Sequence, residues 1–369
     1  MSNTVKFLEL GRLNDRYWPE FMVTAERTIK SGSYIGGDEV TGFEREFADY
    51  CGSKYCVGVG NGLDALVLAL RALGVTAGDE VIVPGQTFIA TWLAVTAVGA
   101  KIVPVDVEED SANVDASKIE AAITPRTKAI IPVHLYGATA GMAEIMRIAR
   151  LRDIYVVEDA AQAHGHVRFG KRAGTHGHVG CFSFYPSKNL GALGDGGGIV
   201  TDDETIAKRV RLLANYGSTE KYVHQECGTN SRLDPIQAAF LRLKLQNLDW
   251  IAERRKQIAD VYSEALRRNS SSVRRLLGES YDSVWHNFVV VADDREHLVA
   301  HLRKHGIETA LHYPLIPSLQ ACYRDEFATA TLPISKSLSE RSLSLPIGEY
   351  LELEEVTRVA DALRQYEGK

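Results

Sequence analysis

The chain lacks several features that would place it in other classes of protein. None of its apolar runs is long enough to cross a bilayer as a helix. Arg12, Asp15 and Arg16 interrupt the N-terminus, where a signal peptide would need an apolar stretch. The formal net charge of −6 argues against a nucleic-acid partner, because neutralising phosphates requires a basic surface. We therefore expect a cytoplasmic protein that binds neither membranes nor nucleic acid.

Cysteine is also scarce. The five cysteines are an odd number, lie scattered and form no Cys-x-x-Cys pair, which argues against a disulfide framework and a cysteine-rich zinc site. We expect no bound metal and a reducing compartment. The remaining composition, with 45% hydrophobic and 24% charged residues, is ordinary for a globular protein. The 369 residues are enough for one large and one smaller domain.

Seven short apolar runs bounded by turn residues occur in the first part of the chain, and helix-like segments such as 64–73 and 143–152 separate most of them. Strands that alternate with helices predict a mostly parallel sheet covered on both faces. The close spacing of the last two runs predicts a mixed sheet at that point. The runs are residues 55–59, 81–84, 101–105, 129–133, 154–157, 180–184 and 198–201.

The pattern changes after Asp234. Apolar residues at helical spacing, without proline or glycine after the first position, predict one long helix over residues 235–267. Residues 325–345, which contain Pro333, are expected to form a loop. The sequence therefore predicts a large domain of residues 1–240 with an N-terminal arm, and a smaller α+β domain of residues 241–369. Further elements of the smaller domain are a strand over 286–292, a helix over 297–305, an extended segment over 309–314 and a terminal helix over 352–366.

The most informative residues are Asp159, which follows the run 154–157, and Lys188, which ends the sequence Cys-Phe-Ser-Phe-Tyr-Pro-Ser-Lys. Both would lie at the carboxyl ends of strands, where open α/β sheets bind their ligands. Such a pair fits pyridoxal phosphate, because a lysine forms its Schiff base and a carboxylate keeps its ring nitrogen protonated. Taken singly, Asp159 could cap a following helix and Lys188 could be a surface lysine.

Two features suggest a place for the cofactor phosphate. Asn61 and Gly62 follow a strand and open a helix, whose N-terminus offers free N–H groups to an anion; a plain strand-to-helix turn is the alternative. Ser183 alternates with Phe182 and Phe184, so its hydroxyl would point to the opposite face from both rings. A polar group in that position needs a partner, and a phosphate would serve.

Other residues suggest how a planar ring would be bound. Phe88 follows a strand and could stack on the ring, although a lone phenylalanine more often packs in a core. Gln162 lies about one helical turn beyond Asp159 and could donate to the phenolic oxygen of the cofactor, or be solvated. The glycine-rich residues 194–198 suit a tight turn beneath a cofactor or an ordinary hairpin.

These motifs resemble those of the DegT/DnrJ/StrS sugar aminotransferases, within fold type I of the pyridoxal-phosphate enzymes. The resemblance extends from Gly36-Gly37 to beyond Tyr313. It implies an α/β, aspartate-aminotransferase-like fold with a large seven-stranded mixed α/β/α domain and a smaller α+β C-terminal domain. It also implies an obligate homodimer. The matching segments are residues 58–66 (GVGNGLDAL), 158–162 (EDAAQ), 182–188 (FSFYPSK) and 228–234 (GTNSRLD).

The resemblance implies roles for single residues. Lys188 would be the Schiff-base lysine and Asp159 the partner of the ring nitrogen, while Gln162 would contact the ring oxygen. The other residues would bind the phosphate or the ring face: Asn61, Gly62 and Ser183 on the phosphate, Phe88 on the ring, and Asn230 on the phosphate of the neighbouring subunit.

A finer resemblance concerns the substrate. The segment 188–197 (KNLGALGDGG) is similar to that of the branch that aminates C3 of nucleotide-linked 3-keto-6-deoxyhexoses, usually on dTDP, with glutamate as the expected amino donor. Such deoxyamino sugars enter lipopolysaccharides or antibiotics. In this branch the sugar and pyrophosphate would be lined by Tyr185, Lys221, His312 and Tyr313.

Two departures leave the exact sugar open. Ser187 stands where many relatives have glycine, and Ser318 stands where relatives often have histidine. An enzyme that aminates C4 of a 4-keto-6-deoxyhexose is therefore an alternative. A non-catalytic binding or regulatory protein is an alternative from another class, because a fold does not determine a function.

Overall fold

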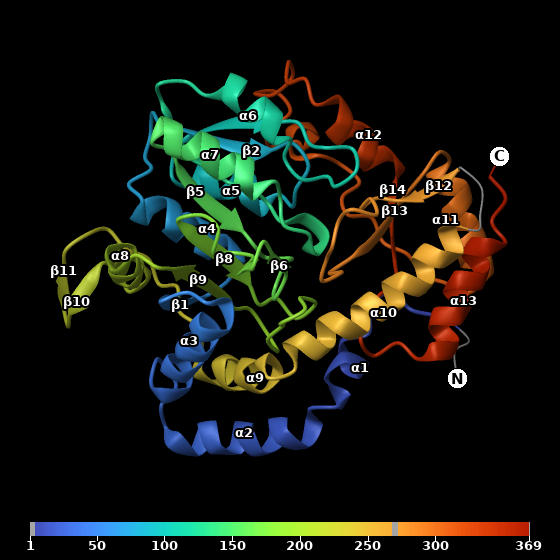
Figure 1. Ribbon diagram of the computed structural model, residues 1–369. Coiled ribbons are helices and arrows are strands. Elements are labelled where there is room, and N and C mark those ends of the chain that lie inside the picture. The colour runs from blue at the N-terminus through green and yellow to red at the C-terminus, as the bar shows by residue number, and fades with distance from the viewer. Residues whose placement is uncertain (1–3, 268–271, 369) are drawn as a thin grey trace.

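The computed structural model describes residues 4–267 and 272–368 and consists of two lobes joined by a long helix (Figure 1). The larger lobe is built on a seven-stranded sheet. Strand β9 runs antiparallel to both of its neighbours, whereas the other adjacent pairs are parallel, so the predicted mixed sheet is confirmed. The spatial order is β1 (Tyr55–Val59), β9 (Gly197–Thr201), β8 (Val179–Ser183), β5 (Tyr155–Asp159), β4 (Thr127–Ile130), β2 (Glu80–Pro84) and β3 (Lys101–Val105).

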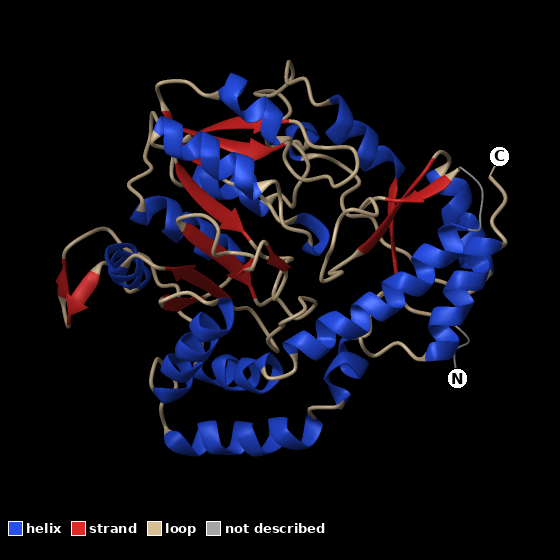
Figure 2. Ribbon diagram, viewed as in Figure 1, coloured by secondary structure: helices blue, strands red, loops and turns tan. Residues whose placement is uncertain are grey.

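Helices cover both faces of this sheet, as the sequence predicts (Figure 2). Successive strand residues point to opposite faces: Val157 and Cys181 pack into one apolar cluster, while Val156 and Phe182 pack into clusters on the other side. Helices of the first cluster are α4 (Gly62–Ala72), α5 (Ala90–Ala97) and α8 (Glu204–Ala214); those of the other side are α3 (Asp38–Cys51), α6 (Ala116–Ala122), α7 (Met142–Arg152) and α9 (Pro235–Leu245).

The smaller lobe has an antiparallel sheet of β12 (Val273–Arg275), β13 (Phe288–Ala292) and β14 (Ser342–Leu345). One face packs against α10 (Leu248–Arg267), α11 (Arg295–Lys304) and α13 (Leu353–Arg364). The other face contributes Val289 and Val291 to a cluster with Leu135 and Tyr136 of the larger lobe. We call this cluster the seam, because it joins the two lobes.

The N-terminal segment contacts the smaller lobe before it returns to the larger one. Val5 forms a parallel bridge with Ile307, and α1 (Leu10–Asp15) and α2 (Trp18–Ser31) then follow, with α2 packed on α9. Two short hairpins, β6–β7 and β10–β11, lie outside both sheets: Val167–Arg168 with Lys171–Arg172, and Ser218–Glu220 with Val223–His224. The domain boundary after residue 240 stays a prediction.

The single helix predicted over residues 235–267 is wrong. The chain forms α9 and α10, separated at Gln246 and Asn247. The Asn247 side-chain amide donates to the Leu243 carbonyl, and the backbone carbonyl of Asn247 accepts the Ile251 N–H. An asparagine that satisfies backbone groups in this way replaces the proline or glycine expected at a helix end. The break lets α9 pack in the larger lobe and α10 in the smaller one.

The loop predicted over residues 325–345 is also wrong in part. Helix α12 (Pro333–Arg341) and strand β14 lie within it. Pro333 occupies the first helical position, where its missing N–H costs nothing. The next two N–H groups, of Ile334 and Ser335, donate to the Asp106 carboxylate at 3.0 and 2.9 Å. The cap therefore comes from a residue far away in the sequence, which local patterns do not reveal.

The helices of the described residues differ from membrane-crossing helices. None of those within residues 4–267 and 272–368 has both the length and the apolar character of a membrane-crossing helix.

Candidate active site

Lys188 lies in the loop that connects β8 with β9. Its N–H donates to the Tyr185 carbonyl at 2.8 Å, which closes a turn just beyond the end of β8. Burial lowers the pKa of Lys188 to about 8, while the charge of Asp159 acts in the opposite direction. About one tenth of this amine is thus uncharged at pH 7, and the neutral form is the one that a nucleophile requires.

Asp159 is the last residue of β5, the strand beside β8. Its carboxylate is buried, and it accepts hydrogen bonds from the Thr91 hydroxyl at 2.9 Å and from the Ala161 N–H at 3.3 Å. Burial raises the pKa of Asp159, against these hydrogen bonds and the positive charge of Lys188. A buried carboxylate without a full counter-charge would gain by pairing with a cationic ligand.

A second buried carboxylate stabilises the end of the same strand. Glu158 accepts the N–H groups of Gly174, His176 and Gly177, and its other contact is with His134 Nε2 at 2.7 Å. His134 Nδ1 faces the Ala140 N–H, so Nε2 carries the proton donated to Glu158. Burial raises the pKa of Glu158, but the contacts with His134 and the backbone outweigh it and leave the pKa lowered.

Helix α4 begins directly after the turn at Gly60 and Asn61, which follows the carboxyl end of β1. Asn61 Oδ1 accepts the Asp64 N–H at 2.8 Å and caps the helix. A side chain at Gly62 would lie 2.6 Å from Ser183 Cβ, so glycine is required for this close approach. Ser231 holds the turn, because its hydroxyl accepts the Gly60 N–H and donates to Asp64.

Gln162 is brought near Asp159 by a turn, not by the helix considered from the sequence; the Ala163 N–H donates to the Ala160 carbonyl. Gln162 Oε1 accepts the Tyr136 N–H at 2.7 Å, and Gln162 Nε2 donates to the Tyr313 hydroxyl at 3.0 Å. Gln162 and Tyr313 are therefore in direct contact across the seam.

Three aromatic or imidazole side chains predicted to contact ligand lie on this side of the molecule. Phe88 is half-exposed and packs 5.5 Å from the Tyr313 ring, and Tyr185 is also half-exposed. His312 Nδ1 lies 2.8 Å from the Ser344 hydroxyl. Burial, together with the charge of Lys188, lowers the pKa of His312 to about 4, so this imidazole is neutral at physiological pH.

Two predicted residues are not brought to Lys188 within a single chain. Lys221 lies in the turn of the β10–β11 hairpin, exposed, with its amine 5.0 Å from the Tyr222 ring. Asn230 is exposed and forms an isolated bridge with Asn215. The hairpin projects away from both lobes (Figure 1). Asn230 was predicted to bind the phosphate of the neighbouring subunit and Lys221 to line the sugar and pyrophosphate, and both roles stay predictions.

Sequence reasoning missed four residues at this site. Thr91 bonds Asp159, Ser231 holds the turn before α4, and His134 supports Glu158. Tyr136 contacts both Gln162 and the His312 carbonyl. The sequence offers one local signal for Thr91, its spacing of four residues from Thr87, and the structure shows the two hydroxyls 2.9 Å apart. The others depend on contacts between distant segments.

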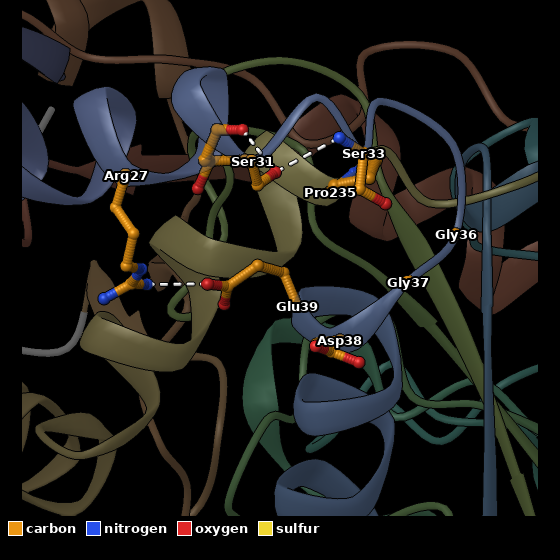
Figure 3. Close-up of a pocket in the computed structure, with 9 residues that line it drawn as sticks. Arg27, Ser31, Ser33, Gly36, Gly37, Asp38, Glu39 and Pro235 are labelled. Carbon is orange, nitrogen blue, oxygen red and sulfur yellow. Dashed lines mark hydrogen bonds and ion pairs between the residues drawn. The ribbon is translucent and has the colours of Figure 1, made fainter.

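A separate hollow of about 380 Å³ lies between α2 and the start of α3. Figure 3 shows Arg27 pointing to Glu39 there, with an ion-pair distance of 2.7 Å. Arg27 and Glu39 thus offset each other's charge, and Asp38 also lines the hollow. No residue predicted to bind cofactor or sugar lines this hollow, so its role is separate from that of the site around Lys188.

The chain matches the DegT/DnrJ/EryC1/StrS aminotransferase family over residues 18–364. It belongs to this family. A dTDP-3-amino-3,4,6-trideoxy-alpha-D-glucose transaminase from Streptomyces venezuelae is 46% identical over 98% of this chain and 96% of that protein.

Solved structures agree with this assignment. That of S. venezuelae DesV in complex with a ketimine intermediate has a TM-score of 0.95 and 46% identity, covering 98% of both chains. Bacillus subtilis NtdA with bound pyridoxamine phosphate has a TM-score of 0.92 and 32% identity, covering 98% of this chain and 85% of that one. The aminotransferase class, the fold and the pyridoxal-phosphate cofactor predicted from the sequence are thus confirmed.

The residues present fit this cofactor. Within the described ranges, no acceptor lies opposite the N–H groups of Gly62 and Leu63 at the start of α4, and the Ser183 hydroxyl is adjacent to Gly62. Such an N-terminus favours a phosphate. Asp159 provides a buried carboxylate and Lys188 an amine of lowered pKa.

Proposed function

We propose that the enzyme transfers an amino group from glutamate to C3 of a dTDP-linked 3-keto-6-deoxyhexose. Two residues carry this proposal: Asp159, a buried carboxylate at the end of β5, and Lys188, an amine of lowered pKa in the loop beyond the adjacent β8. They occur in a chain 46% identical to a relative named as a dTDP-3-amino-sugar transaminase. Because that name specifies a 3-amino sugar, it supports amination at C3 and not at C4.

The bound cofactor supplies an electron sink for a carbanion next to its imine. In the proposal, Asp159 holds the ring nitrogen protonated, and the N-terminus of α4 with Asn61, Gly62 and Ser183 binds the phosphate. Lys188 moves the proton between Cα of the amino donor and the reacting carbon of the cofactor. Its lowered pKa supports this task, because a general base works best when its pKa lies near the operating pH.

The remaining assignments concern orientation. Gln162 would direct its amide to the ring oxygen, since one amide hydrogen remains after its bond to Tyr313, and Phe88 would stack on the ring. His312, Tyr313 and Tyr185 would face the sugar and its pyrophosphate. Because His312 is neutral, it would bind through hydrogen bonds and not through charge.

We further propose a cytoplasmic homodimer in which each subunit completes the site of its partner. Lys221 and Asn230 would act across that interface. Their exposure on or beside a projecting hairpin supports this arrangement, because such a segment reaches beyond its own lobe.

Amination assays test the substrate. The purified enzyme, loaded with cofactor and glutamate, is offered dTDP- and UDP-linked 3-keto and 4-keto sugars, and the position of the new amine is read by NMR. We expect turnover with the dTDP-linked 3-keto sugar and an amine at C3. An amine at C4, or a preference for UDP, would contradict the finer assignment. Absence of a visible cofactor band before glutamate is added would contradict the role proposed for Lys188.

A further inference from the structure

Tyr136 lies in the turn Leu135–Gly137, which follows β4 and is buried within the seam. Only 1% of its surface is exposed and its hydroxyl donates to a backbone carbonyl, so the side chain has no free donor for a substrate. The turn is seated tightly on residues 283–285: a side chain at Gly137 would lie 2.9 Å from Ser283 Oγ and 3.0 Å from the Trp285 nitrogen. The Ser283 hydroxyl also donates to the Tyr136 carbonyl at 3.2 Å.

Tyr136 is connected to the segment His312–Tyr313 in two ways, through its backbone N–H and through its hydroxyl. Its N–H donates to Gln162 Oε1, and Gln162 Nε2 donates to the Tyr313 hydroxyl. The phenolic hydroxyl of Tyr136 donates to the carbonyl of His312, the residue before Tyr313. Tyr136 thus bonds the carbonyl of the His312–Tyr313 peptide directly. It also contacts the Tyr313 hydroxyl indirectly, through the side chain of Gln162.

The other contacts of His312 come from the smaller lobe or the N-terminal segment. Its ring bonds Ser344 in β14 and lies 5.7 Å from the Phe7 ring. These contacts orient the imidazole within its own lobe, whereas the bond from Tyr136 connects it to the lobe that carries Lys188. The Tyr136 hydroxyl therefore bonds His312 itself to the larger lobe, beside the bond that connects Gln162 with Tyr313.

We propose that Tyr136 is a positioning residue that sets His312 and Tyr313 for the nucleotide sugar, without contact to it. This inference rests on the proposed function, since it assumes that His312 and Tyr313 bind the sugar. It predicts a selective defect: loss of the hydroxyl should disturb the sugar and leave glutamate almost unaffected, because the Tyr136 N–H and its bond to Gln162 remain.

The test compares Tyr136→Phe with Tyr262→Phe, a matched control. The Tyr262 hydroxyl is equally buried and donates to the Pro346 carbonyl at 3.0 Å, within the core of the smaller lobe. Both variants thus remove one buried hydroxyl from one backbone carbonyl. Each enzyme, loaded with pyridoxal phosphate, is mixed in single turnovers with glutamate or with a dTDP-linked 3-amino-3,6-dideoxyhexose, and the cofactor absorbance is followed.

A second readout does not depend on turnover. Each holoenzyme is reduced with borohydride, and the dissociation constant of the same amino sugar is measured by calorimetry. For Tyr136→Phe we expect the rate of reaction with the amino sugar, or the affinity for it, to fall by about tenfold or more, the size of effect expected from the loss of one hydrogen bond. The rate of reaction with glutamate should fall by less than about twofold. Tyr262→Phe should match the wild type in both reactions.

The outcomes separate this inference from the function on which it rests. Failure of the wild-type enzyme to react with the amino sugar would overturn the proposed substrate and this inference together. If the wild type reacts, equal losses with both donors in Tyr136→Phe, or no loss, would overturn the inference alone. A sugar-specific loss of equal size in Tyr262→Phe would also overturn it, because removal of a buried hydroxyl far from His312 would then have the same effect.

Discussion

The two sides of the proposed active site are held in different ways. Asp159 and Ser183 end adjacent strands of the seven-stranded sheet, and Lys188 follows in the next turn. Tyr313, by contrast, meets Gln162 across 151 positions of the chain and through a single hydrogen bond. The first side is positioned by the strand ladder, which many bonds maintain. The second depends on a few contacts across the seam.

This difference corresponds to a division of work. The ladder side would perform the steps common to every amino donor, and those steps tolerate little displacement of the reacting groups. The seam side would choose the sugar, and a few hydrogen bonds are easier to change without loss of the fold. The seam is therefore where substrate preference could vary while the chemistry stays the same.

The largest effect is expected on the ladder side. Lys188→Ala should bind the cofactor without a borohydride-trappable bond and lose transamination altogether, because the amine that carries the cofactor and moves the proton is gone. Absorbance before and after borohydride, together with a discontinuous assay, checks both parts. Turnover close to that of the wild type would remove Lys188 from its proposed role.

Asp159→Asn should reduce turnover by at least about a hundredfold, the range for loss of one electrostatic stabiliser in an active site. The variant keeps the shape but leaves the ring nitrogen without a negative partner. Asp202→Asn is a suitable control, since Asp202 also accepts a backbone N–H, from Lys54, but lies beyond the end of β9. Equal rates in the two variants, at equal cofactor content, would contradict the role of Asp159.

The predicted exchange between subunits extends the comparison to a third region, the projecting hairpin. Dimers that pair a Lys188→Ala chain with an Asn230→Ala chain contain one intact site if the sites are shared. Such mixed dimers should show about half the wild-type rate, as expected for one of two symmetric sites. Co-expression with two affinity tags isolates them. Inactive mixed dimers would mean that Asn230 serves its own chain.

The sequence predicts the side of the site held by the strand ladder better than the side held by contacts across the seam. The seven apolar runs match the seven strands to within a few residues. Asp159 ends β5 as predicted, whereas Lys188 lies in the loop beyond β8 and not at the strand end itself. Strands can be predicted because the spacing of apolar residues and the residues that form turns are signals within a short stretch of sequence. The cap of α12 by Asp106, the contact of Ser231 with Gly60 and the position of Tyr136 all join distant segments. No local pattern encodes such pairs, and these are the features that sequence reasoning missed.

On the seam side, His312→Asn should slow the reaction with the nucleotide sugar by about tenfold, the equivalent of about 1.4 kcal/mol or one hydrogen bond. The reaction with glutamate should remain within about twofold, because Lys188 and Asp159 are untouched. Single-turnover spectra with each amino donor separate the two reactions. Equal damage to both, or none to either, would mean that His312 has only a structural role.

The smallest effect concerns the protonation of Lys188 itself. Addition of pyridoxal phosphate to the apoenzyme requires a neutral amine, and burial lowers the pKa of Lys188 from 10.5 to about 8. The rate should therefore rise with pH, by about fivefold between pH 7 and pH 8, and level off above pH 8. An unperturbed lysine would instead show a rate that increases up to about pH 10. Stopped-flow absorbance from pH 6.5 to 10 distinguishes the two profiles.

Asp159→Asn should shift the plateau to lower pH, since it removes the one charge that favours the protonated amine. A plateau unchanged by that substitution would mean that the two strand ends are not electrostatically coupled.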